Sequence, residues 1–212
     1  LVKNIEGAAD DYEKMYIART MLALDTHIDW SWLSFEFDTN ARVNQKHNGN
    51  SRILGFYRND ARKNVVSHNH PNTVAHEMGH ALDYQWARDL GCGNYTALTD
   101  ISRTTERITD ADERQFFDNF KVFMDSLTDN GDIRSEYTQD PKEVFARFIA
   151  RFVQWVDNTG GNRSYTTEVD YYNDKFTASN YIEFVKLLQE KALLDAKKMS
   201  NDTLAEDVKF QD

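Results

Sequence analysis

The side chains best suited to chemistry stand together in one short motif, His76-Glu77-Met78-Gly79-His80, which has the pattern H-E-x-x-H. In a helix, residues four apart share one face about one turn apart, so both imidazoles could reach one zinc ion at about 2.0–2.1 Å. Glu77 could touch a water on the zinc without binding the metal, which is the general-base position of metalloproteases. The motif predicts a zinc site with a catalytic base; the alternative is a surface helix with two exposed histidines.

A catalytic zinc bound by two histidines needs a third protein ligand. The metzincin pattern would take it from the same segment, but this chain has Asp83 where that pattern has glycine and Trp86 where it has histidine. A carboxylate from a later helix is the remaining common solution. Glu143 is the best candidate, and Glu106 and Glu113 are its rivals.

The segment around Glu143 has a face of small residues. Glu143, Ala146, Arg147 and Ala150 share one side of a predicted helix. The two alanines would let this helix approach the motif helix closely, and Gly79 would help from the other side. The alternative is an i,i+4 surface ion pair between Glu143 and Arg147, which would contribute only about 0.3–0.5 kcal/mol.

Other residues near the motif have weaker assignments. Asp83 falls on the ligand face, where a hydrogen bond to a ligand histidine such as His80 would fix that ring's orientation, with Arg147 as ion partner. The alternative interpretation is that Asp83 is an ordinary aspartate exposed to solvent. His68 and His70 precede the motif helix and could line the cleft or bind a second metal, although loop histidines mostly do neither.

The elements that must position these groups follow from hydrophobic periodicity and turn residues. We predict a helix over 4–24, strands within 30–43, 53–57 and 64–67, a loop over 44–50, the motif helix over 71–90, and helices around 116–127, 141–157 and 178–198. The last two strands suit a hairpin. The sequence therefore predicts an α+β fold that is mostly helical, with a small antiparallel sheet of about three strands before the motif helix.

The composition limits the function classes. The chain has 212 residues and 40% hydrophobic content, enough for one domain over residues 1–212 with a sizeable core. Its net charge of −10 argues against nucleic-acid binding. No apolar run approaches the roughly 18 residues of a membrane span. Cys92 is the single cysteine, so no internal disulfide forms. Because the chain opens at Leu1 without a methionine, we expect it to be a processed product or a domain of a longer protein.

Two segments, His76-Glu77-Met78-Gly79-His80-Ala81-Leu82-Asp83 and Glu143-Val144-Phe145-Ala146-Arg147-Phe148, together resemble the zincin-like metallopeptidase domain of large phage and plasmid polyvalent proteins. The layout is also similar to the catalytic domain of anthrax lethal factor, and the resemblance covers roughly residues 52–156. It implies a zincin-like fold with His76, His80 and Glu143 as zinc ligands and Glu77 as base. It also suggests Tyr137 as the oxyanion donor.

From these features we expect a gluzincin-like zinc metalloendopeptidase that acts on protein or peptide substrates, with an intracellular or virion-associated location favoured over a secreted toxin. Two alternatives stay open: a non-catalytic zinc-binding module of a virion or toxin, and a zinc amidase acting on cell-wall peptides. The intact Glu77 argues against the first, because a purely structural zinc needs no base. The composition does not choose between the substrates, and the sequence does not set the oligomeric state.

Overall fold

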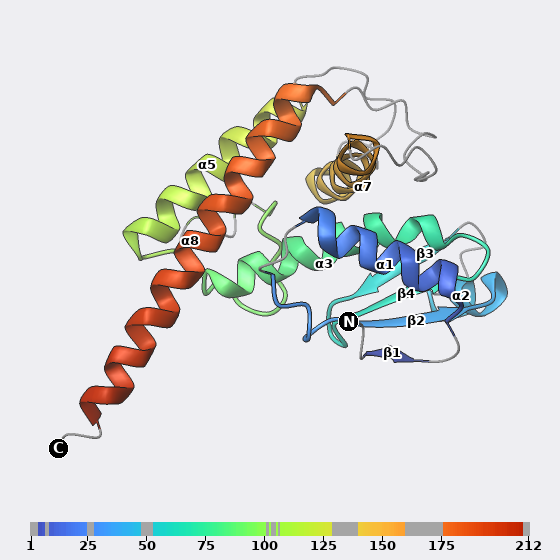
Figure 1. The fold of residues 1–212 in the computed structure, drawn as a ribbon, viewed down its shortest axis with the longest axis horizontal. Coiled ribbons are helices and arrows are strands. Elements are labelled where there is room, and N and C mark those ends of the chain that lie inside the picture. The colour runs from blue at the N-terminus through green and yellow to red at the C-terminus, as the bar shows by residue number, and fades with distance from the viewer. Residues whose placement is uncertain are drawn as a thin grey trace.

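The computed structural model describes residues 4–6, 9–24, 28–47, 53–100, 102, 105, 107–128, 140–159 and 176–209. Within these residues, a small four-stranded sheet lies beside a mostly helical body (Figure 1). The predicted combination of a small sheet and a largely helical body is therefore confirmed. The helices are α1 (Asp11–Leu24), α2 (Asn40–Lys46), α3 (Val74–Asp89), α5 (Ala111–Thr128), α7 (Pro141–Thr159) and α8 (Ala178–Lys209).

The sheet is mixed rather than antiparallel, which corrects the prediction. Its strands are β1 (Ile5–Glu6), β2 (Ser34–Asp38), β3 (Gly55–Arg58) and β4 (Lys63–Ser67), in the order β1-β2-β4-β3. β1 pairs with β2, and β2 with β4, in parallel, while β3 and β4 form the predicted antiparallel hairpin. Parallel neighbours need a crossover connection, and α1 provides one between β1 and β2.

Two predicted elements are each divided in the structure. The predicted helix over 4–24 is β1 followed by α1. The predicted strand over 30–43 is β2 followed by α2, which also occupies the first three residues of the predicted loop, 44–46. The change from strand to helix occurs at Thr39, whose side chain accepts a hydrogen bond from the Arg42 N–H and so caps the first turn of α2. The regular alternation of Phe35 and Phe37 ends just before this cap.

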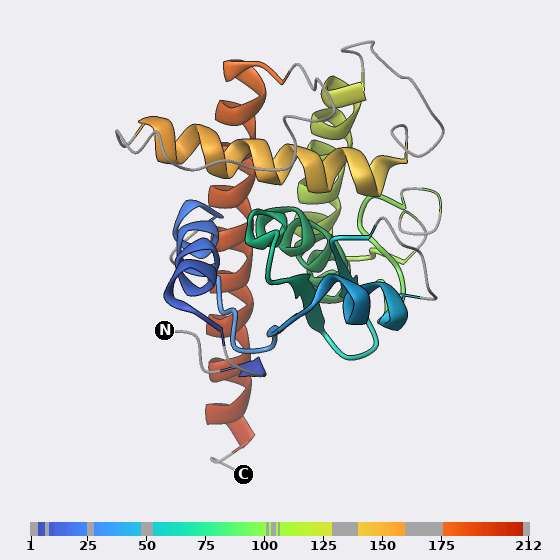
Figure 2. The same ribbon diagram turned by 90° about the vertical axis from the view of Figure 1, so that its right-hand side faces the viewer.

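The motif helix α3 lies at the centre of the molecule, between the sheet and α7 (Figures 1 and 2). It begins after a single 3₁₀ turn, Pro71–Thr73, and it ends before Gly91, close to the predicted bounds. α3 and α7 cross at small residues: a Cβ added to Gly79 would lie 2.8 Å from Ala146 Cα and 3.1 Å from Ile149 Cβ. Because the two backbones nearly touch, this crossing fixes the separation of the side chains beside it.

Aromatic side chains fill the core between α3, α5, α7 and α8. Trp86 of α3 meets Phe116 of α5 edge-on, with ring centroids 5.5 Å apart, and Phe145 of α7 lies 6.1 Å from Phe184 of α8. The apolar stripe predicted between residues 116 and 127 is buried here, as expected of a core helix. In Figure 2, α7 lies across α5 and α8 and so joins them to α3.

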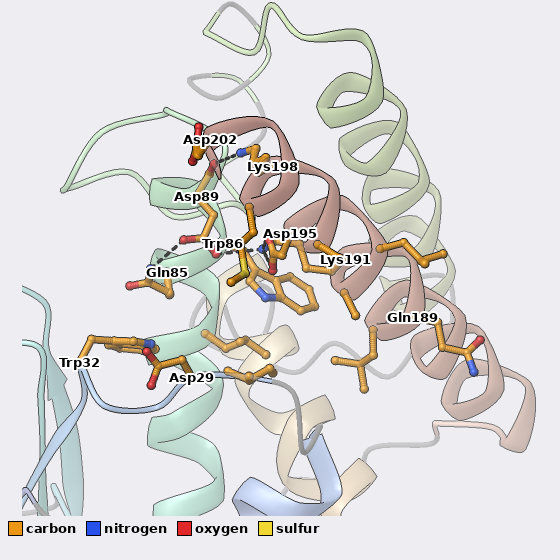
Figure 3. A pocket seen from close by; sticks show the side chains of 17 residues that line it. Asp29, Trp32, Gln85, Trp86, Asp89, Gln189, Lys191, Asp195, Lys198 and Asp202 are labelled. Carbon is orange, nitrogen blue, oxygen red and sulfur yellow. Dashed lines mark hydrogen bonds and ion pairs between the residues drawn. The ribbon is translucent and has the colours of Figure 1, made fainter. Parts of the chain in front are cut away.

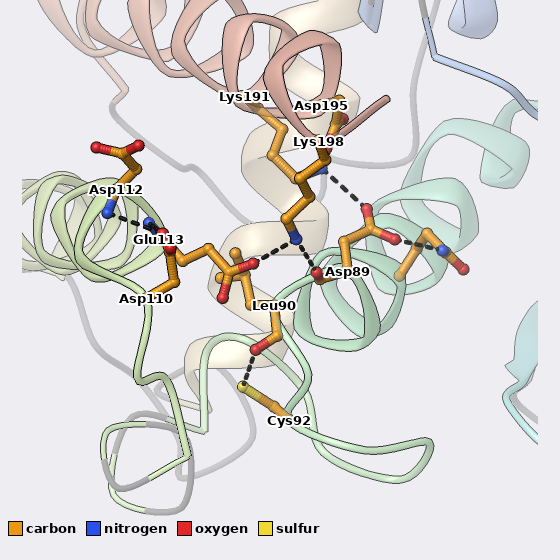
Figure 4. A network of polar contacts seen from close by, with 10 residues as sticks. Asp89, Leu90, Cys92, Asp110, Asp112, Glu113, Lys191, Asp195 and Lys198 are labelled. Carbon is orange, nitrogen blue, oxygen red and sulfur yellow. Dashed lines mark hydrogen bonds and ion pairs between the residues drawn. The ribbon is translucent and has the colours of Figure 1, made fainter. Parts of the chain in front are cut away.

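Polar contacts hold α8 to the C-terminal end of α3 (Figure 4). The Lys198 ammonium donates to the Asp89 carbonyl at 2.6 Å, and Lys191, which is 4% exposed, bridges Asp89 at 2.9 Å and Asp195 at 2.7 Å. Cations are favourable beside the C-terminus of a helix, where carbonyls lack partners. We call Asp89, Lys191, Asp195 and Lys198 the α3–α8 clamp. None of the helices that the structure describes is long and apolar enough to cross a membrane.

Candidate metal centre

Three side chains from two helices converge where α3 passes α7. The Nε2 atom of His76 lies 3.3 Å from one carboxylate oxygen of Glu143, and the Nε2 atom of His80 lies 3.5 Å from the other. The two imidazole rings are 4.9 Å apart between centroids. One ligand atom from each of the three residues lies within 4.8 Å of the others, so the group could hold a metal ion.

The helix crossing explains why these residues meet. His76 precedes Gly79 by three positions on α3, and Glu143 precedes Ala146 by three positions on α7. Because the helices touch at Gly79 and Ala146, side chains about one turn before each contact point are brought together. Pro141 stands at the start of α7, so Glu143 projects from its first turn.

The charge states of Glu143 and His76 suit a metal ion. Burial would raise the pKa of the Glu143 carboxyl, but the two neighbouring imidazoles hold it well below its usual range, so Glu143 is ionised. Burial lowers the pKa of His76 and so favours the neutral ring that ligates metals. For His80, the effect of burial is outweighed by Glu143 and Glu77, and its pKa is raised. The Glu143 oxygen that faces His76 is shielded from water, as expected of a ligand atom directed at an ion.

Glu77 is buried beside this group, with 4% of its surface exposed. Its side chain lies against Gly55 of β3: a Cβ added to Gly55 would be 3.3 Å from Glu77 Oε1 and 2.9 Å from the Thr73 methyl group. The strand can therefore approach the carboxylate only because residue 55 lacks a side chain. Sequence reasoning missed Gly55, although a glycine inside a strand pattern is a known signal of close backbone approach.

Asp83 is completely buried, so it is not the solvated aspartate of the alternative interpretation. Its two oxygens accept hydrogen bonds from the Thr99 N–H at 2.9 Å and the Thr99 hydroxyl at 2.6 Å. Burial raises the pKa of Asp83 to about 6, against the opposing effect of Thr99 and of nearby His80. These bonds go to Thr99 rather than to a ligand histidine as predicted, and nothing in the sequence marks Thr99 as their donor.

The two histidines before α3 do not join the group. His68 directs its Nδ1 atom to the buried carboxylate of Glu13 on α1, 2.6 Å away, and so connects the start of the motif segment to that helix. His70 precedes the 3₁₀ turn as its capping residue. Neither residue belongs to the donor group formed in the described part of the chain.

The other residues predicted to take part in the site are Glu106, Glu113, Tyr137 and Arg147. Glu113 forms an ion pair with Lys198 of α8, so it is not a ligand in this arrangement. Arg147 is 3% exposed and Glu143 faces the histidines, so the two side chains are not the solvent-exposed pair of the alternative interpretation. Glu106 and Tyr137 lie outside the described residues, and their predicted roles stay predictions.

Comparisons of the chain with protein-family models, with curated proteins and with solved structures find no match. The resemblance to zincin-like metallopeptidases therefore rests on the residues of the two short motifs. The chemistry of the site is accordingly the basis for inferring a function, because a fold alone does not determine one.

Proposed function

We propose that this chain is a zinc-dependent metallopeptidase whose metal is held by His76, His80 and Glu143. The observation that carries the proposal is the convergence of their ligand atoms within 4.8 Å, beside a buried glutamate. Two histidines and one carboxylate are the ligand set of known catalytic zinc sites that keep a fourth position open. A structural zinc is usually enclosed by four protein ligands, mostly cysteine and histidine, and the single cysteine, Cys92, is not part of the donor group found among the described residues.

A zinc ion held there would polarise a peptide carbonyl and lower the pKa of a bound water towards about 7. The protein contributes the proton transfers. Glu77 accepts the proton of the attacking water and delivers it to the leaving amine, which requires a carboxylate adjacent to the metal ligands but not bound to the metal. Its burial against Gly55 restricts the side chain, so the carboxylate is held ready for this transfer.

The sheet edge offers a place for the substrate backbone. In the described part of the chain, β3 is the outer strand beside β4, and Gly55 at its start lies next to Glu77. An extended peptide that pairs with such an edge gains main-chain hydrogen bonds irrespective of its sequence. The donor that stabilises the developing oxyanion is proposed to be Tyr137, on the motif resemblance alone.

The test combines metal content with hydrolysis. The purified chain should bind one zinc per molecule and cleave an unfolded protein, and a chelator should abolish the cleavage. Glu77→Gln should retain zinc while turnover falls by at least the roughly 10²–10⁴-fold typical of acid–base catalysis. Glu143→Ala should lose zinc, whereas Glu113→Ala, a matched control, should retain it.

Each outcome has a different consequence. Zinc binding without hydrolysis of protein or of cell-wall peptides would favour a non-catalytic module. Cleavage of cell-wall peptides alone would assign the chain to the amidases. Wild-type zinc affinity in Glu143→Ala would overturn the proposed ligand set.

A further inference from the structure

A second feature lies on the side of α3 away from the histidines. A cavity of about 1040 Å³ separates α3 from α8 and is closed at one end by residues 28–32 (Figure 3). Its apolar lining includes Leu82 and Trp86 of α3 and Leu188 of α8. Leu193 and Met199 of α8 border it while 73% and 71% exposed. We call this space the α3–α8 groove.

The groove has the dimensions of a site for a chain segment rather than for a small molecule. Its volume reaches the upper end of the roughly 300–1,000 Å³ of small-molecule pockets, and it is open to solvent along α8. Leu193 and Met199, six positions apart on α8, both add a large exposed apolar side chain to the border of the groove, and exposed apolar surface of this kind marks binding sites. Figure 1 shows that α8 continues well beyond the body of the molecule past this point.

The charges of the side chains that line the groove favour a positively charged partner. Four aspartates line it, against two lysines, Lys191 and Lys198. Both lysines are already bound within the α3–α8 clamp or to Glu113. Asp29 and Asp202 are exposed and have no cationic partner among the residues that the structure describes. Figure 3 places these two aspartates on opposite sides of Trp86, so negative charge flanks an apolar centre.

The secondary structure of the residues that line the groove favours a helical partner over an extended peptide. The groove is formed by two helices and a short segment, and no strand of the described chain lines it. Helix backbones have satisfied their own hydrogen bonds, so an extended peptide would find few main-chain partners there. A third helix can instead lay its apolar face on the open side of the groove, against the exposed side chains of α8, as amphipathic helices do in hydrophobic grooves.

We propose that the α3–α8 groove binds an amphipathic helix of another protein, with apolar residues on one face and lysine or arginine on its flanks. A second copy of this chain fits poorly, because its net charge of −10 would add negative charge to an already acidic groove. The proposal is independent of the zinc site, which lies on the other side of α3.

The test uses a synthetic peptide of about 14 residues, roughly four helical turns, with leucine at helical spacing and lysine at the other positions. A matched peptide carries glutamate in place of every lysine. In calorimetric titrations of the full chain, the lysine peptide should bind at least about tenfold more tightly than the glutamate peptide, since opposite charges favour the first and like charges oppose the second.

Two pairs of variants locate the binding. Leu193→Ser with Met199→Ser should weaken binding of the lysine peptide by about tenfold or more, because the apolar anchors of the groove are removed. The control is Leu22→Ser with Val122→Ser, two residues that are also exposed, at 61% and 70%, but lie outside the groove. Asp29→Asn with Asp202→Asn should weaken binding and reduce its salt dependence. Asp60→Asn with Asp118→Asn is the corresponding surface control.

Equal affinity in groove and control variants would show non-specific attraction to an acidic protein and would overturn the proposal. Equal binding of the two peptides would do the same. Sedimentation of the chain alone gives a further check: a dimer that Leu193→Ser with Met199→Ser abolishes would assign the groove to a second copy, and the proposed partner would be wrong.

Discussion

The two sides of α3 are built in opposite ways. On the side of the histidines, Gly79 lets the backbone of α7 approach until an added Cβ would be 2.8 Å from Ala146 Cα. On the other side, α8 is held at a distance by Lys191 and Lys198, and a cavity of about 1040 Å³ remains between the helices. The helix α3 therefore packs closely against α7 on one side and leaves a cavity beside α8 on the other.

The difference shows how packing relates to function. Metal ligands must be held within a fraction of an ångström, which close backbone contact achieves and long flexible side chains do not. A docking groove must instead leave room for its partner, and the α3–α8 clamp permits this because the reach of lysine spans the gap. Substitutions that fill space should therefore be harmful on one side of α3 and tolerated on the other.

The largest expected effect is that of filling the close contact. Gly79→Val would place side-chain atoms within the backbone of α7 at Ala146, which cannot move aside without shifting the helix. Overpacking of this kind costs about 1–3 kcal/mol or more, and here it should also separate His76 from Glu143. We expect a lower free energy of unfolding in urea and a clear loss of zinc affinity.

Ala192→Val is the matched control on the other side, since Ala192 lines the α3–α8 groove where space is available. It should change the free energy of unfolding by no more than about 0.5 kcal/mol and leave zinc affinity unchanged. Similar effects of the two substitutions would contradict the contrast between the close-packed and open sides.

The sequence predicts the close-packed side well. The spacing of His76 and His80 and the small face of Ala146 are local patterns, and they correctly indicate α3, α7 and their close approach at Gly79. Among the three candidate glutamates, the alanines that share its helix face favour Glu143. That choice agrees with the convergence of ligand atoms in the structure. The zinc itself stays a prediction.

The sequence does not predict what depends on distant neighbours. β1 has only two residues, which is too short for a periodic signal, so the sequence does not predict its parallel pairing with β2. The donors to Asp83 come from Thr99, sixteen positions away, through a connection with no motif. The α3–α8 groove depends on where α8 lies relative to α3, and amphipathic periodicity shows which face of a helix is apolar but not how completely that face is covered.

A smaller effect is expected at Asp83, which lies on the close-packed side without solvent contact. Because burial raises its pKa from the ordinary 3.8 to about 6, the ionised form is disfavoured in the folded state. Its contribution to stability is therefore complete below about pH 4 and is lost as the pH rises through about 6. Asp83→Asn removes this titration, and its Oδ1 can still accept from the Thr99 N–H.

The measurement is urea unfolding of zinc-free protein at about pH 4 and about pH 7. Relative to wild type, the free energy of unfolding of Asp83→Asn should rise by roughly 2 kcal/mol between these pH values, since each pKa unit corresponds to about 1.4 kcal/mol and an unfolded aspartate is already partly ionised at about pH 4. Asp60→Asn is the control: Arg58 lowers the pKa of the exposed Asp60 side chain, so its difference from wild type should move in the opposite direction. A pH-independent difference for Asp83→Asn would contradict the raised pKa.

The smallest expected effect concerns the open side, where Lys198 contacts both the Asp89 carbonyl and Glu113. Lys198→Met keeps the length of the side chain but removes the cation beside the C-terminus of α3. Because its side chain is 38% exposed, water and salt weaken these contacts, and we expect a loss of only about 1 kcal/mol in the free energy of unfolding. Lys186→Met, which removes a more exposed ion pair on the same helix, should change stability less.

Neither variant should alter zinc affinity, because the clamp and the metal ligands lie on different sides of α3. A loss of zinc in Lys198→Met would show that the position of α8 is transmitted to the ligands, and the two sides of α3 could no longer be treated as independent.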